Sequence, residues 1–129
     1  MEMTEFFKGI VDTSENPIVI CGFDYKVLYA NPVAEKFYKM SGPEYRKTEK
    51  LAGSKLELFF NEESMSKIRM TIEWFKEDVK NKKVFAFHQK ETNSDMYVVA
   101  LRDSKNNLIG MYSRMESRVP DTSKEFDID

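Results

Sequence analysis

The stretch LYANPVAE, residues 28–35, decides the fold because it predicts the point at which a strand gives way to a helix. The apolar residues before Asn31 are typical of a strand. The Asn31 side chain can accept from a free backbone N–H, and Pro32 at the first helical position loses no hydrogen bond. We therefore expect a helix that begins after Asn31 and ends at the Ser-Gly-Pro sequence of residues 41–43.

Two segments precede this helix. Residues 17–21 are apolar and largely β-branched, residues 22–26 supply a turn, and residues 27–30 are apolar again, which predicts a hairpin. Upstream, residues 4–12 have the spacing of an amphipathic helix, which ends before Pro17 because the residue preceding proline disfavours helical angles. The apolar face of this lead-in helix consists of Phe6, Phe7, Ile10 and Val11.

The second half of the chain predicts one long helix and three strands. The helix is capped by Asn61 or Ser64 and ends near Asn81, and its apolar residues recur three and four apart. They are Met65, Ile68, Ile72, Phe75 and Val79. The expected strands are residues 84–90, 96–102 and 108–115, separated by turn-rich segments.

Both alternating sets of residues in the last three strands are apolar, which favours a sheet covered on both faces. The middle helices can cover one face, and the lead-in helix or a second subunit the other. The pattern leaves open which set points inward.

The composition is that of one globular domain. The 129 residues are 41% hydrophobic and 13% aromatic, enough apolar mass for a single core. Twenty basic and twenty-two acidic residues are interspersed along the chain, which argues against a nucleic-acid partner. The N-terminus is unlike a signal peptide, and no apolar run approaches the roughly 18 residues of a membrane span. We expect a soluble, cytoplasmic protein that binds neither nucleic acid nor membrane.

The predicted order is helix, two strands, helices, three strands, and several phrases accompany it. They are NPIVI at 16–20, LYANPVAE at 28–35, GSKL at 53–56 and NLIG at 107–110. This sequence resembles the PAS family. The resemblance implies an α+β fold, with a five-stranded antiparallel sheet, an N-terminal amphipathic helix and helices between strands 2 and 3. Residues 1–118 would form the PAS domain, with residues 1–13 as its lead-in helix, and residues 119–129 a polar C-terminal tail.

The sequence departs from the PAS pattern at two places. The first hairpin turn has Asp24-Tyr25 where many relatives have Asp-Gly, and residues 44–50 look like an insertion. Neither departure contradicts the expected fold, although the insertion could reshape the mouth of a pocket.

The resemblance implies a small-molecule site between the sheet and the middle helices. Some PAS domains hold haem through a histidine on the long helix, but residues 64–81 contain none. Members that form a covalent flavin adduct need a cysteine before that helix, and residues 31–81 contain none. Haem and covalent flavin are therefore not supported, and noncovalent flavin is left open without positive support.

The walls of such a pocket are expected to be mainly apolar, with a few polar groups that select the ligand. The candidates are Phe37, Leu58, Ile68, Ile72, Phe75 and Phe87, with His88, Tyr97 and Tyr112 as polar groups. His88 is first interpreted as a core or half-exposed residue, and second as a ligand contact or pH-responsive group. Cys21 is first interpreted as a small buried residue, with a redox-sensing thiol as the alternative.

Three functions compete. The first is a signal-transduction sensor that binds a small, mainly apolar ligand and relays its occupancy to a partner or dimer interface. The second is an interaction module with a side-chain-filled core that forms a homodimer through Phe6, Phe7, Ile10 and Val11. The third is a small enzyme, which we do not expect because one histidine, one cysteine and no glycine-rich phosphate loop leave few catalytic combinations. The residues at 121–124 only loosely resemble the family's link to an output domain, so the effector protein is unknown.

Overall fold

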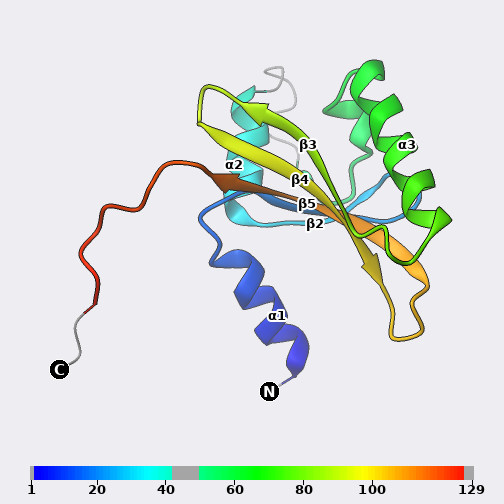
Figure 1. Cartoon of the computed structure of the whole chain (residues 1–129), viewed down its shortest axis with the longest axis horizontal. Coiled ribbons are helices and arrows are strands. Elements are labelled where there is room, and N and C mark those ends of the chain that lie inside the picture. Colours follow the sequence, from blue (N-terminus) through cyan, green and yellow to red (C-terminus); the bar gives the residue numbers. More distant parts are fainter. Residues whose placement is uncertain (1, 42–49, 127–129) are drawn as a thin grey trace.

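The computed structural model describes residues 2–41 and 50–126, so the expected insertion at 44–50 lies almost wholly outside the described residues. Figure 1 shows a curved sheet with helices α2 and α3 on one side and α1 on the other. The elements are α1 (Met3–Asp12), β1 (Ile18–Cys21), β2 (Val27–Ala30), α2 (Pro32–Ser41), the 3₁₀ helix η2 (Leu56–Leu58), α3 (Glu62–Glu77), β3 (Lys83–Gln89), β4 (Ser94–Arg102) and β5 (Leu108–Ser117).

The five strands form one antiparallel sheet in the order β2-β1-β5-β4-β3. This arrangement confirms the expected fold class, with the two halves of the chain meeting where β1 pairs with β5. Strand β5 lies at the centre, and β2 and β3 are the edges. Helix α2 packs against β1 and β2, and α3 packs against β5 and η2, so both helices cover the same face.

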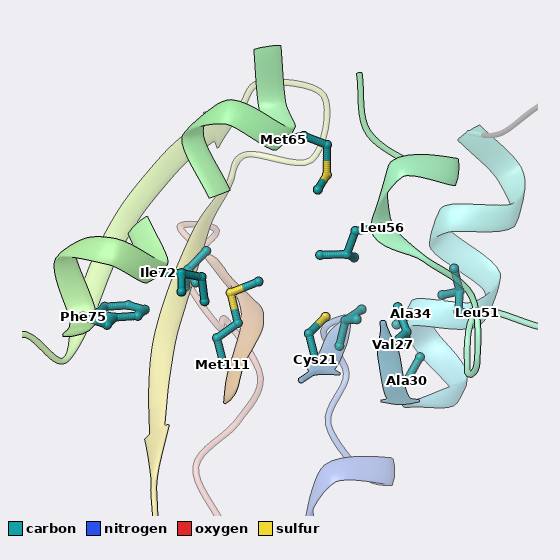
Figure 2. Close-up of a cluster of buried hydrophobic side chains, with 12 residues drawn as sticks. Cys21, Val27, Ala30, Ala34, Leu51, Leu56, Met65, Ile72, Phe75 and Met111 are labelled. Carbon is teal, nitrogen blue, oxygen red and sulfur yellow. The ribbon is translucent and has the colours of Figure 1, made fainter. Parts of the chain in front are cut away.

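The sheet register shows which residues of β1, β4 and β5 share the face that is covered by α2 and α3. Val98 lies opposite Ser113, and Met111 lies opposite both Cys21 and Ala100. Figure 2 shows the buried side chains of the sheet converging with those of α2, η2 and α3. The core residues shared between these elements include Val19, Cys21, Val27, Leu56, Met65, Ile72, Phe75 and Met111.

Helix α1 does not cover the outer face of the sheet, which corrects one of the two expected arrangements. It forms where its apolar spacing predicted, but none of its residues is buried. Figure 1 shows it projecting away from the sheet. In the described part of the chain it is attached through its C-terminal half: Asp12 accepts a hydrogen bond from the Tyr29 hydroxyl, Val11 O accepts from Asn31 Nδ2, and Lys8 Nζ lies 5.7 Å from the centre of the Tyr29 ring.

Helix α3 ends at Glu77 and not near Asn81. The expected Val79 position therefore lies outside the helix, and its side chain is exposed. The free carbonyls of the last turn are taken up by side chains from elsewhere: Arg102 Nη2 donates to Phe75 O at 2.6 Å and Asn81 Nδ2 donates to Trp74 O at 2.7 Å. These bonds replace further helical turns.

Candidate ligand-binding cavity

A cavity of about 680 Å³ lies between the sheet and the helices of its covered face. Its volume falls within the roughly 300–1,000 Å³ that small-molecule sites occupy. The lining from β1, β4 and β5 is Val19, Cys21, Met96, Val98, Met111 and Ser113, and the lining from η2, α3 and the residues beside them includes Leu51, Leu56, Phe59, Phe60, Ile68 and Thr71. Most of these side chains are apolar, so the interior favours an apolar occupant.

The mouth of the cavity lies between α3 and β3. The exposed apolar side chains of the lining come from these two elements: Met70 and Trp74 from α3, and Phe85 and Phe87 from β3. Among the described strands β3 pairs with β4 alone, so this side of the sheet ends in an edge strand next to the opening. A ligand can enter here without disturbing the central strands.

The cavity has few polar groups. Burial raises the pKa of Tyr38 to about 12, although a hydrogen bond with Ser113 opposes the shift. The phenol is therefore neutral and, with the Ser113 hydroxyl, offers uncharged hydrogen bonding on the inner side. Helix α3 adds Ser64, Lys67 and Thr71, which are spaced three and four residues apart and so share one face of the helix.

The single cysteine of the chain, Cys21, belongs to the same lining. Burial, with a smaller contribution from the charge of Asp24, raises the pKa of its thiol to about 12. The thiolate is the nucleophilic form of cysteine, so this environment suppresses its reactivity. The geometry favours the interpretation of Cys21 as a small buried residue.

The structure brings only part of the expected pocket together. Ile68 and Phe87 lie in the lining. Phe37 and His88 border a second, more open hollow of about 470 Å³ beside β3, to which Phe87 also contributes. Leu58 is exposed and lies outside both hollows.

Four further expected positions also lie outside the main lining. Ile72 and Phe75 lie deeper in the packed core than the cavity, because the spacing of α3 points them at the sheet and not at the mouth. Tyr97 and Tyr112 lie on the opposite face of the sheet, since Tyr97 alternates with the inward residues Met96 and Val98, and Tyr112 alternates with Met111 and Ser113.

His88 has a structural partner outside the main cavity. Its Nδ1 lies 2.8 Å from Asp95 Oδ1, and the same carboxylate accepts from Arg118 Nε at 2.8 Å. The pKa of Asp95 is lowered below its usual value, and the hydrogen bond from the Arg118 guanidinium contributes most to this shift. This cluster ties together β3, β4 and the residue that follows β5.

Sequence reasoning missed Lys67, Met70 and Trp74, which lie on the rim of the cavity. All three are on α3, within two positions of its apolar stripe, and the three- and four-residue spacing of the buried side chains does not by itself indicate them. The sequence does contain a signal for the rim: Met70 and Trp74 are apolar and widen the apolar stripe of α3 beyond the residues needed for the core.

Asn31 connects the cavity side of the sheet to the lead-in helix. Its side chain is completely buried. Its Nδ2 donates to Val11 O and to Asn16 O, both at 3.0 Å. Its Oδ1 accepts from Ile18 N at 3.0 Å and from Ala34 N at 2.9 Å. One amide thus joins the end of α1, the start of β1 and the start of α2.

Solved structures with the same architecture include several PAS domains. A PAS domain from Colwellia psychrerythraea matches with a TM-score of 0.62 at 11% identity, over 90% of this chain and 97% of that one. The PAS domain of BvgS from Bordetella pertussis matches with a TM-score of 0.57 at 14% identity, over 91% of this chain and 87% of that one. The chain has the PAS fold. A sensory box sensor histidine kinase from Vibrio cholerae is similar, with a TM-score of 0.57 at 17% identity, over 88% of this chain and 90% of that one.

These structural matches confirm the fold that the sequence resemblance implied, whereas no profile of a protein family and no curated protein matches the amino-acid sequence. In the part of the PAS-fold chain that is described, no group of three or more histidine, cysteine or acidic side chains is arranged to hold a metal ion. Over the same residues, no helix combines the length and the apolar character needed to cross a membrane.

Proposed function

We propose that this PAS-fold chain is a cytoplasmic sensory module that binds a small, mainly apolar molecule and relays its occupancy to a partner, with no chemistry of its own. The observation that carries the proposal is the apolar cavity of about 680 Å³ with a mouth between α3 and β3. The structural neighbours lend support, since one of them is described as a sensory box sensor histidine kinase.

The relay is proposed to run through β1. Val19 and Cys21 of this strand line the cavity, and the backbone N–H of Ile18 in the same strand is held by Asn31. Because Asn31 also holds Val11 O, a change in the position of β1 would reach the end of α1. Packed elements of this kind switch between discrete arrangements, and a ligand that favours one of them shifts the population.

Native mass spectrometry of the gently purified protein, compared with the denatured protein, tests the proposal. We expect a bound mass that is released on denaturation, or thermal stabilisation by members of an apolar metabolite library. The variant Ile68→Trp should lose this binding because it fills the cavity. The matched variant Val79→Trp, which adds the same ring at an exposed position outside the lining, should keep it. Absence of binding in the wild type across both measurements would refute the proposal.

A second candidate function is self-association through α1, which one observation favours. Phe6, Phe7 and Ile10 are 54%, 60% and 69% exposed, and together they form an apolar face on a helix that projects from the domain. Exposed apolar surface of this kind marks interaction sites. We propose a second copy of the chain as the partner, with α1 of one copy against α1 or the outer sheet face of the other.

Sedimentation velocity over a concentration series tests this second candidate. The wild type is expected to dimerise, whereas Phe7→Asp and Ile10→Asp should be monomeric because each would bury an unpaired charge. Val119→Asp places the same charge at an exposed apolar residue outside α1, and should leave the dimer intact. A monomeric wild type, or a dimer unaffected by the α1 variants, would contradict self-association through this helix.

A further inference from the structure

The charge at the mouth of the cavity restricts the class of ligand. Among the described residues of the lining, Lys67 is the only one with a formal charge. It lies on α3 among the lining residues and its side chain is 75% exposed, so its ammonium group is open to solvent at the edge of the cavity. A ligand that fills the interior would place its outer end near Lys67 Nζ.

Within the described part of the chain, the ammonium group has one ion pair, and that pair is weak. Lys67 Nζ lies 3.9 Å from Glu63 Oε1, with side chains that are 75% and 82% exposed. Exposed pairs at this separation contribute little, because both charges remain hydrated. The neighbouring carboxylate of Glu62 is engaged by Arg69 Nη1 at 2.8 Å, and so competes less for Lys67. A ligand anion can therefore replace Glu63 as the partner of Lys67.

Two hydroxyl groups flank Lys67 on the same face of α3. Ser64 precedes it by three residues and Thr71 follows it by four, and both line the cavity. The Thr71 hydroxyl already donates to Lys67 O at 2.8 Å. The Ser64 hydroxyl is thus the neutral donor of this stripe that can supplement the ammonium group.

We infer that the cavity takes an amphiphile with one anionic head, of which a fatty carboxylic acid is the simplest, with its chain in the apolar interior and its carboxylate at Lys67 Nζ. The inference rests on the proposed function and adds the chemical class of the ligand. Lysine suits this position because its apolar stem can lie along the rim while its head stays in water. The same arrangement disfavours cationic amphiphiles, whose head would meet Lys67.

The experiment compares dodecanoate with dodecanol, which has the same chain and no charge. Trp74 is the only tryptophan of the chain and lies on the rim, so its fluorescence reports binding directly. We expect dodecanoate to bind roughly three- to tenfold more tightly than dodecanol at low salt, as a partly exposed charge-assisted contact should give. The advantage should shrink as the salt concentration rises.

Variants assign this advantage to Lys67. Lys67→Met keeps the apolar stem and should bind the acid and the alcohol equally, whereas Lys67→Arg should keep the preference for the acid. Lys76→Met, on the same helix but outside the lining, should behave as the wild type. Glu63→Gln should bind the acid at least as tightly as the wild type, because it removes the competing carboxylate.

The results of these experiments distinguish failure of the inference about an anionic ligand from failure of the proposed sensory function. If dodecanol binds as tightly as dodecanoate, or if Lys67→Met keeps the preference for the acid, the inference is overturned while the sensory proposal stands. If neither compound binds, and shorter and longer acids such as octanoate and hexadecanoate also fail, the inference is overturned. Failure of the apolar library as well would overturn the sensory proposal.

Discussion

Replacement of Asn31 by alanine is expected to destabilise the domain far more than the loss of an ordinary helix cap. The variant removes the acceptor of Ala34 N at the start of α2, a change that costs about 1 kcal/mol. It also removes the acceptor of Ile18 N at the start of β1, a half-buried residue, and an N–H group that is left without a partner away from water costs roughly 1–3 kcal/mol. Val11 and Asn16 are half-buried, so their carbonyls can turn to water at a smaller cost.

These contributions give an expected loss of about 3 kcal/mol in the free energy of unfolding, out of the roughly 5–15 kcal/mol typical of a domain. Urea denaturation followed by circular dichroism measures it. For a chain of this length the melting temperature should fall by roughly 10–15 °C.

A matched control is the variant Asn61→Ala. Asn61 is also an asparagine cap, but it is exposed and accepts a single bond, from Ser64 N at 2.8 Å. Its removal is expected to cost about 1 kcal/mol. Asn31→Asp is a further comparison, because it keeps both accepted bonds of Asn31 and loses the donation to Val11 O and Asn16 O. Equal losses for Asn31→Ala and Asn61→Ala would refute the argument that burial and the four-way connection set the cost.

Four further outcomes are expected from single features of the structure. Gly110→Ala places a Cβ 2.3 Å from Cys21 O, a backbone atom of β1, and should cost about 1–3 kcal/mol or more by urea denaturation. The Cys21 thiol, with its raised pKa, should be alkylated slowly in the folded protein and rapidly in urea; equal rates would contradict its burial. Arg102→Met removes the donor to the end of α3 and should cost about 1–2 kcal/mol, with faster amide exchange in the last helical turn. Because its folded-state pKa is lowered, Asp95 contributes stability above its unfolded-state pKa of about 3.8, which is lost as the pH falls through the folded value, so Arg118→Gln should unfold at a higher pH in an acid titration.

The element order could be predicted because its signals are local. The Asn-Pro sequence at 31–32 fixes the start of α2, and the spacing of apolar residues in 4–12 and 65–75 fixes the faces of α1 and α3. A helix end that depends on distant groups has no such signal. The end of α3 is held by Arg102, which lies 27 residues beyond Phe75, and the prediction for this end was therefore wrong.

The first hairpin illustrates a second limit. The sequence has Tyr25 where glycine is usual, and Tyr25 adopts φ 60°, the left-handed conformation that glycine adopts most easily. The turn keeps its geometry because other bonds hold it: Lys26 N donates to Asp24 Oδ1, and Leu56 N donates to Tyr25 O. The turn was thus predicted correctly, whereas its strain and its contact with the start of η2 depend on residues far along the chain.

A bulge in β3 changes the face of the sheet to which its side chains point. For this reason the lining of the cavity could not be predicted from the alternation of residues in the strands. Phe85 and Phe87 are two residues apart and would share a face in a regular strand. The bulge between them breaks this rule: Phe85 pairs with Tyr97 of the outer face, while Phe87 pairs with Met96 of the inner face. Because β3 is an edge strand, the extra residue disturbs only one set of ladder bonds. Both residues border the cavity, but the bulge gives them different neighbours: the ring of Phe85 packs against Tyr97, at 5.5 Å between ring centroids, whereas Phe87 lies beside Met96 of the inner face.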